Sequence, residues 1–245
     1  NGVGIAGQGV AARIPVDEAV RFLASIDHQS SVDGVGPVAI GSVPFVPQSS
    51  GEAVVPKVLV RKHSDGSALV TVCGDIADAE VAKLLAPRDP LPAHSSSYKI
   101  ASLVEIDHYL DAVSTARDEV RSGALTKAVI ARPILVEASE PIDVHAVLRR
   151  LRASFGSSYR YSIDGFIGAS PELLVEIEGP TVRSHPLAGT APRTGDVEND
   201  ARIAEGLIAS TKNQIEHRVV IDVVWSALSR QLPHWGATRV MKPSS

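Results

Sequence analysis

Apolar residues recur at the spacing of an α-helix in several separate stretches of the chain. In residues 16–26, for example, Val16, Val20 and Leu23 fall on one helical face. Further helices are predicted at residues 76–86, 105–122, 144–153, 199–211 and 214–231. Gly123 supports the end of the helix 105–122, because glycine readily adopts the left-handed conformation that closes a helix.

Short runs rich in β-branched and aliphatic residues lie between these helices. The predicted strands are residues 37–40, 54–60, 68–73 and 126–136, with several more within 158–187. Ser-Gly and Asp-Gly pairs separate the runs and are typical of turns. Because strands and helices do not alternate in a regular βαβ order, the pattern indicates an α+β fold with antiparallel strands.

A stretch rich in Pro and Ser, residues 87–97, has no periodicity and is the best candidate for a linker. It separates a β-rich part, residues 1–98, from a second part, residues 99–245. A chain of this length forms one large domain or two small ones and buries roughly 70–75% of its unfolded surface. We expect the two parts to belong to one structural domain.

Composition and charge exclude several classes of partner. The 24 Lys and Arg residues against 28 Asp and Glu residues give a net charge of −4, which argues against nucleic acid and anionic membranes. A single cysteine, Cys73, excludes a disulfide within the chain, and it follows an apolar run typical of a small core residue. No apolar stretch approaches the ~20 residues of a membrane span, and the start lacks the features of a signal peptide. We therefore expect a cytoplasmic protein.

Two short motifs suggest functions that their surroundings do not support. Residues 2–7 match the GxGxxG pattern of dinucleotide-binding loops, but only Asn1 precedes them, where that reading needs a strand. Residues 168–172 begin like the GxSxG turn of serine hydrolases, but Glu172 stands in place of the second glycine. The eight histidines show no metal-binding spacing.

Lys127 is the first candidate for chemistry, because it opens the predicted strand and shares a face with Val129 and Ala131. A lysine among apolar neighbours loses hydration, which favours a neutral amine that can act as a base. The alternative is a lysine at the end of a strand that reaches into solvent.

Glu172 is the second candidate, because Gly168 and Pro171 interrupt the strand just before it. There it falls opposite an apolar face formed by Leu173 and Val175. A carboxyl group against apolar walls is favoured in its neutral form and can serve as a general acid. The alternative is a loop carboxylate in water.

Glu216 is the third candidate, because it lies on the same helical face as Val220, Val223 and Ala227, which we expect to point towards the core. A carboxylate directed inward needs a cation. Lys212, four residues earlier, offers a simple salt bridge, whereas a hard divalent ion is the functional alternative.

Four segments together resemble the chorismate-utilising enzymes. Residues 127–132 resemble their KxVxxR strand, 166–172 their GxSPE segment, 186–193 their P(L/I)xGTxxR motif, and 210–217 their SxKDxxEH motif. The four occur in the family's order with similar gaps, and the resemblance covers most of residues 100–230 and, more faintly, residues 41–45.

This resemblance implies a fold of two large antiparallel β-sheets packed face to face with helices outside, of which the chain holds an incomplete part. It also implies the roles of particular residues. Lys127 matches the base that activates water for attack at C2 of chorismate, and Glu172 matches the acid that protonates the departing C4 hydroxyl. Gly189 and Thr190 match residues that contact the substrate, and Glu216 matches a ligand of Mg²⁺.

Within the family, the chain is most similar to the isochorismate synthases, which are Mg²⁺-dependent isomerases. Anthranilate synthases carry an xxDLxRND segment after the EH pair, and the sequence after His217 lacks it. Water is then expected as the nucleophile rather than ammonia. A salicylate synthase, which also eliminates pyruvate, is the alternative enzyme. A non-catalytic fragment or binding module is the alternative of another class. The pathway, siderophore or menaquinone, and the oligomeric state stay open.

Two departures from the family pattern bear on these expectations. Asn213 stands where the family has an aspartate, which removes a possible outer-shell carboxylate of the metal site. The chain also ends at Ser245, before a segment that in the family supplies a histidine, an arginine, a tyrosine and a second metal-binding glutamate. We expect a chain without that segment to bind Mg²⁺ weakly.

Overall fold

The computed structural model describes residues 3–32, 35–46, 49–87 and 96–231. The chain divides into two compact units, and the boundary between residues 93 and 94 falls in the predicted linker, of which residues 88–95 lie outside the described part. Unit 1 comprises residues 1–93 together with 162–167, and unit 2 comprises residues 94–161 and 168–245. That the two parts form one structural domain stays a prediction.

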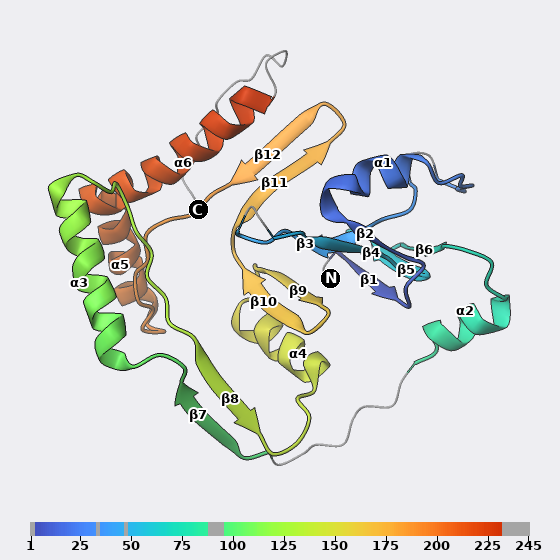
Figure 1. The fold of residues 1–245 in the computed structure, drawn as a ribbon, viewed down its shortest axis with the longest axis horizontal. Coiled ribbons are helices and arrows are strands. Elements are labelled where there is room, and N and C mark those ends of the chain that lie inside the picture. Colours follow the sequence, from blue (N-terminus) through green and yellow to red (C-terminus); the bar gives the residue numbers. More distant parts are fainter. Residues whose placement is uncertain (1–2, 33–34, 47–48, 88–95, 232–245) are drawn as a thin grey trace. The chain divides into compact units, whose positions relative to one another are not determined.

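Unit 1 is built on two three-stranded antiparallel sheets (Figure 1). The first sheet has the order β1 (Gly4–Gln8), β5 (Val58–Lys62) and β6 (Ala68–Val72). The second has the order β2 (Ala12–Pro15), β4 (Glu52–Val55) and β3 (Ile40–Ser42). A short 3-10 turn (Val16–Glu18) leads into helix α1 (Ala19–Ala24), and α2 (Asp78–Leu85) follows β6.

The buried core of unit 1 lies on β2, β4 and β5, and its members are Ile14, Ala53, Val55, Val58 and Leu59. Phe22 and Leu23 of α1 pack against this cluster, which is why α1 presents its apolar face to the sheet. Cys73 packs there too, as predicted for a small core residue, and burial raises the pKa of its thiol.

Two predictions in unit 1 need correction. The predicted strand 54–60 is two strands, β4 and β5, because Pro56 lies between them and has no N–H to donate to a sheet. The GxGxxG glycines from Gly4 to Gly7 belong to strand β1, which pairs with β5. These residues therefore contribute to a sheet and do not form a phosphate-binding loop.

Unit 2 contains four helices and three two-stranded sheets among its described residues (Figure 1). The helices are α3 (Ile106–Ser122), α4 (Val144–Ser154), α5 (Val197–Ala209) and α6 (Thr211–Gln231). The strand pairs are β7 (Tyr98–Ser102) with β8 (Ile134–Ala138), β9 (Tyr159–Ile163) with β10 (Phe166–Ser170), and β11 (Leu173–Glu178) with β12 (Thr181–His185). The tip of the β9–β10 hairpin groups with unit 1.

Local sequence signals explain where these elements start and stop. Helix α3 ends at Gly123, whose φ of 82° is the predicted left-handed closing conformation. Asp143 caps α4 by accepting a hydrogen bond from the backbone N–H of His145. Between β9 and β10, Asp164 and Gly165 both have positive φ, as the tight turn of a twisted hairpin requires. The α+β class with antiparallel sheets is therefore confirmed.

The predicted strand 126–136 is wrong over its first part, since only residues 134–138 form β8. Its partner β7 ends at Ser102, after which the chain turns into α3, so residues 127–133 pair with no strand among those described. Pro133 also has no N–H to offer. Lys127, which was expected to open a strand, therefore lies in a segment without helix or strand ahead of β8.

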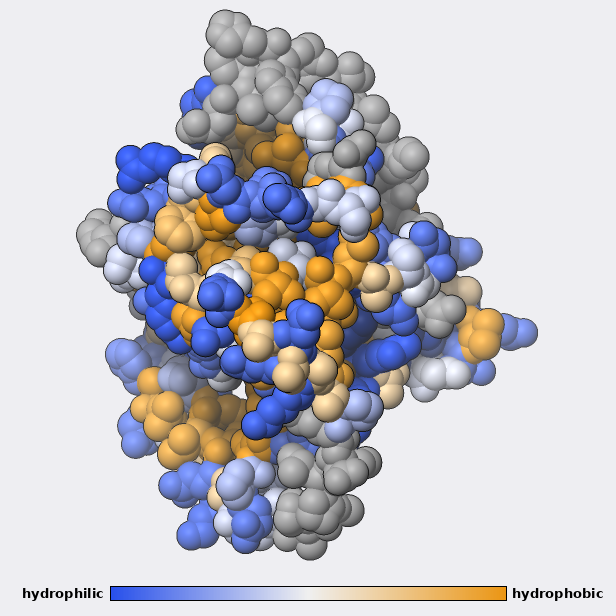
Figure 2. Space-filling model, turned by 90° about the vertical axis from the view of Figure 1, so that its right-hand side faces the viewer, coloured by the Kyte–Doolittle hydropathy of each residue, from blue (hydrophilic) through white to orange (hydrophobic). Residues whose placement is uncertain are grey.

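Many large apolar side chains of unit 2 reach the surface. On the β7–β8 ribbon the cross-strand pair Ile100 and Val136 is exposed, as are Tyr98 and Ile134 on the same face. Figure 2 shows that apolar residues also lie open among hydrophilic ones on the face in view. A two-stranded ribbon is marginally stable without a layer against its apolar face.

Candidate functional site

Lys127 and Glu216 form an ion pair within unit 2. The distance from Lys127 Nζ to Glu216 Oε1 is 3.1 Å, and the two side chains are 27% and 35% exposed. The cation beside Glu216 is therefore Lys127, and not Lys212, which was one of the two alternatives. Lys127 and Glu216, two of the three residues that the sequence proposes for chemistry, thus contact each other directly.

The surroundings of Lys127 differ from the prediction. Val129, expected to line an apolar face beside it, is 81% exposed, and Ala131 is exposed as well. Without a paired strand to fix the alternation, these side chains do not wall in the lysine. What half-buries Lys127 is its position against helix α6, where it reaches Glu216.

Glu216 lies in the second turn of α6, which begins one residue after Ser210. Ser210 Oγ accepts a hydrogen bond from Asn213 N at 3.4 Å, which is the bond that an N-capping serine makes. The predicted inward face is rotated, because Val223 is 64% exposed while Ile221 and Val224 are half-buried. Glu216 therefore lies at the edge of the covered face.

Glu172 lies in the turn between β10 and β11 and is half-buried. Its Oε1 accepts a hydrogen bond from Leu187 N at 3.4 Å. Ser170 holds the turn from the other side, because its Oγ accepts from Glu172 N at 3.1 Å. Of the predicted apolar wall, Leu173 is half-buried but Val175 is exposed, and a backbone amide is the neighbour that orients this carboxyl group.

The loop after β12 carries Gly189 and Thr190 in succession. Gly189 has a φ of 93°, a conformation that strongly favours glycine, and a Cβ there would lie 3.3 Å from Asn213 Oδ1. Asn213 belongs to α6, so the loop rests against the helix that carries Glu216. Thr190 is exposed beside it.

Unit 2 thus connects all four motif segments. Lys127 contacts Glu216 on α6, Asn213 of the same helix contacts Gly189, and Leu187 of the same loop contacts Glu172. Among the described residues no hydrogen bond or ion pair joins Lys127 directly to Glu172. A base candidate and an acid candidate therefore lie at the two ends of one chain of contacts.

The described residues do not by themselves make a site for Mg²⁺. Within residues 3–32, 35–46, 49–87 and 96–231 no group of three or more His, Cys, Asp or Glu side chains is placed to hold a metal ion. Glu216 supplies one carboxylate, and its Oε1 faces Lys127. Mg²⁺ takes six oxygens in octahedral geometry, so one carboxylate fills only a small part of that shell.

Sequence reasoning missed Asp200, which lies in the first turn of α5. Its carboxylate accepts hydrogen bonds from Thr194 N and Thr194 Oγ1, at 2.7 and 2.9 Å, and from Gly195 N at 3.3 Å. The backbone N–H of Thr194, its hydroxyl and nearby Arg193 hold the pKa of Asp200 below its usual range. The signal in the sequence was a Thr-Gly-Asp turn just before a predicted helix.

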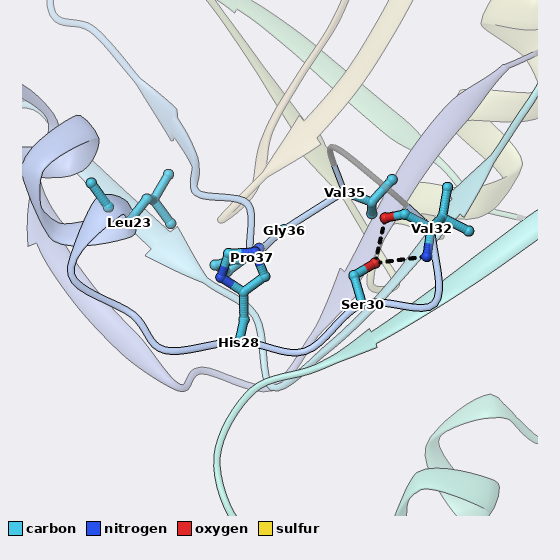
Figure 3. Close-up of a pocket in the computed structure, with 8 residues that line it drawn as sticks. Leu23, His28, Ser30, Val32, Val35, Gly36 and Pro37 are labelled. Carbon is cyan, nitrogen blue, oxygen red and sulfur yellow. Dashed lines mark hydrogen bonds between the residues drawn. The ribbon is translucent and has the colours of Figure 1, made fainter.

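Unit 1 holds a separate open cavity of about 530 Å³ (Figure 3). His28 and Ser30 line it together with apolar residues such as Leu23 and Val35. None of the predicted site residues lines this cavity, and His28 is the only titratable one among the described residues that do. The acid and base candidates are in unit 2.

Comparisons with known proteins agree on a family. A sequence profile described as chorismate binding enzyme matches residues 16–239. The isochorismate synthase MenF of Bacillus subtilis is 31% identical over 217 residues, which cover 79% of this chain and 46% of that protein. Anthranilate synthase component 1 of Streptomyces coelicolor is 32% identical over 221 residues, which cover 79% of this chain and 43% of that protein.

A solved structure shows the same fold. The menaquinone-specific isochorismate synthase MenF of Escherichia coli superposes with a TM-score of 0.68 at 21% identity, covering 94% of this chain and 55% of that one. The chain thus spans about half the length of the curated relatives it matches. No helix in the described ranges is long and apolar enough to cross a membrane.

Proposed function

Because this chain belongs to the family of chorismate-binding enzymes, we propose that it takes part in converting chorismate to isochorismate. The observation that carries the proposal is the connection of the four motif segments within unit 2, from Lys127 through α6 and the Gly189 loop to Glu172. The similarity to isochorismate synthases supports the choice of reaction within the family.

In the proposed reaction, water attacks C2 of chorismate and the C4 hydroxyl leaves. Lys127 takes a proton from the attacking water, and Glu172 gives a proton to the departing hydroxyl, so the atoms and charges balance. Glu172 Oε1 already accepts from Leu187 N, which leaves Oε2 as the oxygen that carries the proton to be donated. Gly189 and Thr190 contact the substrate.

The ion pair adds a condition to this mechanism. A lysine paired with Glu216 is an ammonium ion and has no lone pair with which to accept a proton. For Lys127 to act as the base, it must leave Glu216 and lose its proton before water attacks. Glu216, once free of Lys127, would be the residue of this chain that holds Mg²⁺, which would supply positive charge beside the substrate.

A second candidate rests on a specific observation. The anthranilate synthase of Streptomyces coelicolor is about as similar to this chain as the isochorismate synthase of Bacillus subtilis. Ammonia would then replace water as the nucleophile. The absence of an xxDLxRND segment after His217 favours water. A salicylate synthase shares the whole proposed reaction and then eliminates pyruvate, so its final product is salicylate.

Product analysis separates these candidates. The protein is incubated with chorismate and Mg²⁺, with and without ammonium, and the mixture is resolved by chromatography. Isochorismate as the product in both conditions supports the proposal. Salicylate supports the alternative that also eliminates pyruvate, and an amino product formed only with ammonium supports the anthranilate alternative. Absence of both chorismate binding and conversion overturns the proposal.

A further inference from the structure

The loop of residues 186–195 depends on its neighbours for its shape. It forms no helix and no strand, so no regular backbone pairing fixes it. Pro186 and Pro192 restrict φ at their own positions only. The contacts of the other residues therefore decide the shape of the segment that contains Gly189 and Thr190.

Two contacts hold the first half of this loop. Leu187 N donates to Glu172 Oε1 at 3.4 Å. Gly189 lies against Asn213 of α6. Both contacts come from residues of the proposed site, so this half of the loop is positioned by the site itself.

Asp200 holds the second half. Its Oδ1 accepts from Thr194 N and Thr194 Oγ1, at 2.7 and 2.9 Å, and its Oδ2 accepts from Gly195 N at 3.3 Å. Arg193 Nε lies 3.6 Å from Oδ2. Hydrogen bonds to an ionised acceptor are about twice as strong as neutral ones, so this is the firmest attachment of the loop to a helix.

These bonds are not needed to start helix α5, because Asp196 does that separately. Asp196 Oδ1 accepts from Asn199 N at 2.8 Å and caps the helix. The Asp200 side chain is only 16% exposed, and its side-chain partners among the described residues all lie in residues 193–195. Its carboxylate is therefore directed at the loop, not at its own helix.

We propose that Asp200 is a positioning residue, which fixes the end of the 186–195 loop so that Gly189 and Thr190 are held in place for the substrate. Asp200 touches neither substrate nor reacting atoms, and it acts through Thr194 and Gly195. The expected effect on substrate binding rests on the proposed function, whereas the expected ordering of the loop by Asp200 does not.

The test compares three variants by amide hydrogen exchange resolved residue by residue. Asp200→Ala removes every acceptor. Asp200→Asn keeps one amide oxygen for Thr194 N but replaces the second acceptor, so Gly195 N loses its partner. Glu198→Gln is the matched control, because Glu198 lies in the same turn, is exposed, and has no hydrogen bond or ion pair within the described part of the chain.

In Asp200→Ala, exchange at Thr194 and Gly195 should accelerate by roughly tenfold or more, since a bond to a charged acceptor is lost. The decisive amide is Leu187, at the other end of the loop, which should accelerate as well. In Asp200→Asn, amide exchange should accelerate more at Gly195 and Leu187 than at Thr194. Glu198→Gln should leave all three unchanged.

The second measurement is the dissociation constant for chorismate. This constant should rise by roughly tenfold in Asp200→Ala, because a loop that is no longer preorganised must be ordered on binding. Loop exchange that responds as expected, together with no chorismate binding by the unsubstituted protein, overturns the proposed function and leaves the positioning role standing.

Unchanged exchange at Leu187 would overturn the proposal, since Asp200 would then serve only its local turn. If Asp200→Ala also exposes the amides of α5, the Asp200→Asn variant decides. If amide exchange in Asp200→Asn accelerates at Gly195 and Leu187 while the amides of α5 stay protected, the positioning role is supported. Any other pattern of exchange in that variant overturns the positioning role.

Discussion

The Lys127–Glu216 pair joins two residues to which the family resemblance assigns different tasks, a base and a metal ligand. Their side chains are about one third exposed, and ion pairs of this kind contribute roughly 0–1 kcal/mol to stability. The pair is therefore weak enough to open for catalysis. Lys127, the proposed base, is therefore expected to matter for chemistry and little for folding.

Lys127→Ala should abolish isochorismate formation, with a loss of roughly 10²–10⁴-fold, because a general base is removed. The melting temperature should change little, since Lys127 makes only a partly exposed ion pair. Lys212→Ala is the matched control and should keep full activity. Lys212 lies on α6, the helix that also carries Glu216. Activity retained in Lys127→Ala would favour the alternative of a solvated lysine.

Glu172→Gln should block loss of the C4 hydroxyl, because an amide does not supply the proton that a carboxylic acid gives. The amide oxygen still accepts the hydrogen bond from Leu187 N, so the loop and chorismate binding should be preserved. The measurement is the dissociation constant for chorismate beside the turnover rate. Near-normal turnover would show that Glu172 is a loop carboxylate without a catalytic role.

At the scale of elements, the sequence predicted the helices better than the strands. Helix α3 and its end at Gly123 follow from local spacing and capping, which the residues themselves carry. The strand expected at residues 126–133 failed because a strand depends on a partner, and β7 ends at Ser102. The same non-local dependence explains why the burial of Lys127 and Glu172 was predicted from the wrong neighbours.

The sequence names the candidate residues of the site but not the contacts between them. The motif order pointed to Lys127, Glu172 and Glu216, yet nothing local says that Lys127 reaches Glu216 across the fold. Asp200 was missed because its partners lie in a loop whose path is not periodic. Their roles in catalysis stay predictions.

Gly189→Ala tests the contact between the loop and α6. The variant forces an alanine to a φ of 93° and brings its Cβ to 3.3 Å from Asn213 Oδ1. Gly123→Ala is the control, because its φ is also positive, at 82°, but the space around it is open. Both should lose roughly 1–2 kcal/mol of stability through backbone strain.

Only Gly189→Ala should also weaken chorismate binding, since it alone displaces Asn213 and the loop. The measurements are the free energy of unfolding and the dissociation constant for chorismate. Equal effects of the two variants on binding would show that the Gly189 turn is not part of a substrate site.

At the scale of the whole molecule, the chain matches about half the length of its curated relatives, and apolar residues such as Ile100 and Ile134 are exposed on a two-stranded ribbon. Exposed apolar strand faces and unpaired edges favour association with another layer. We propose that the rest of the family fold supplies that layer and further groups of the site.

We therefore predict that a polypeptide from a relative can complement this chain. The part of Bacillus subtilis MenF that its match to this chain leaves uncovered, supplied as a separate polypeptide, should raise the melting temperature and strengthen Mg²⁺ binding. The same polypeptide should have no effect on an unrelated α+β protein. Full stability, Mg²⁺ binding and turnover by the chain alone would contradict the proposal that the site needs further groups.

We propose that water attacks chorismate at C2 with Lys127 and Glu172 as base and acid. The deciding measurement is the mass of the product formed in H₂¹⁸O, with the chain alone or complemented as above. Isochorismate should carry ¹⁸O at C2, and the Lys127→Ala variant should give no labelled product. Unlabelled isochorismate would show that the hydroxyl moves within the molecule, and an amino product would show that ammonia is the nucleophile; either result contradicts attack by water.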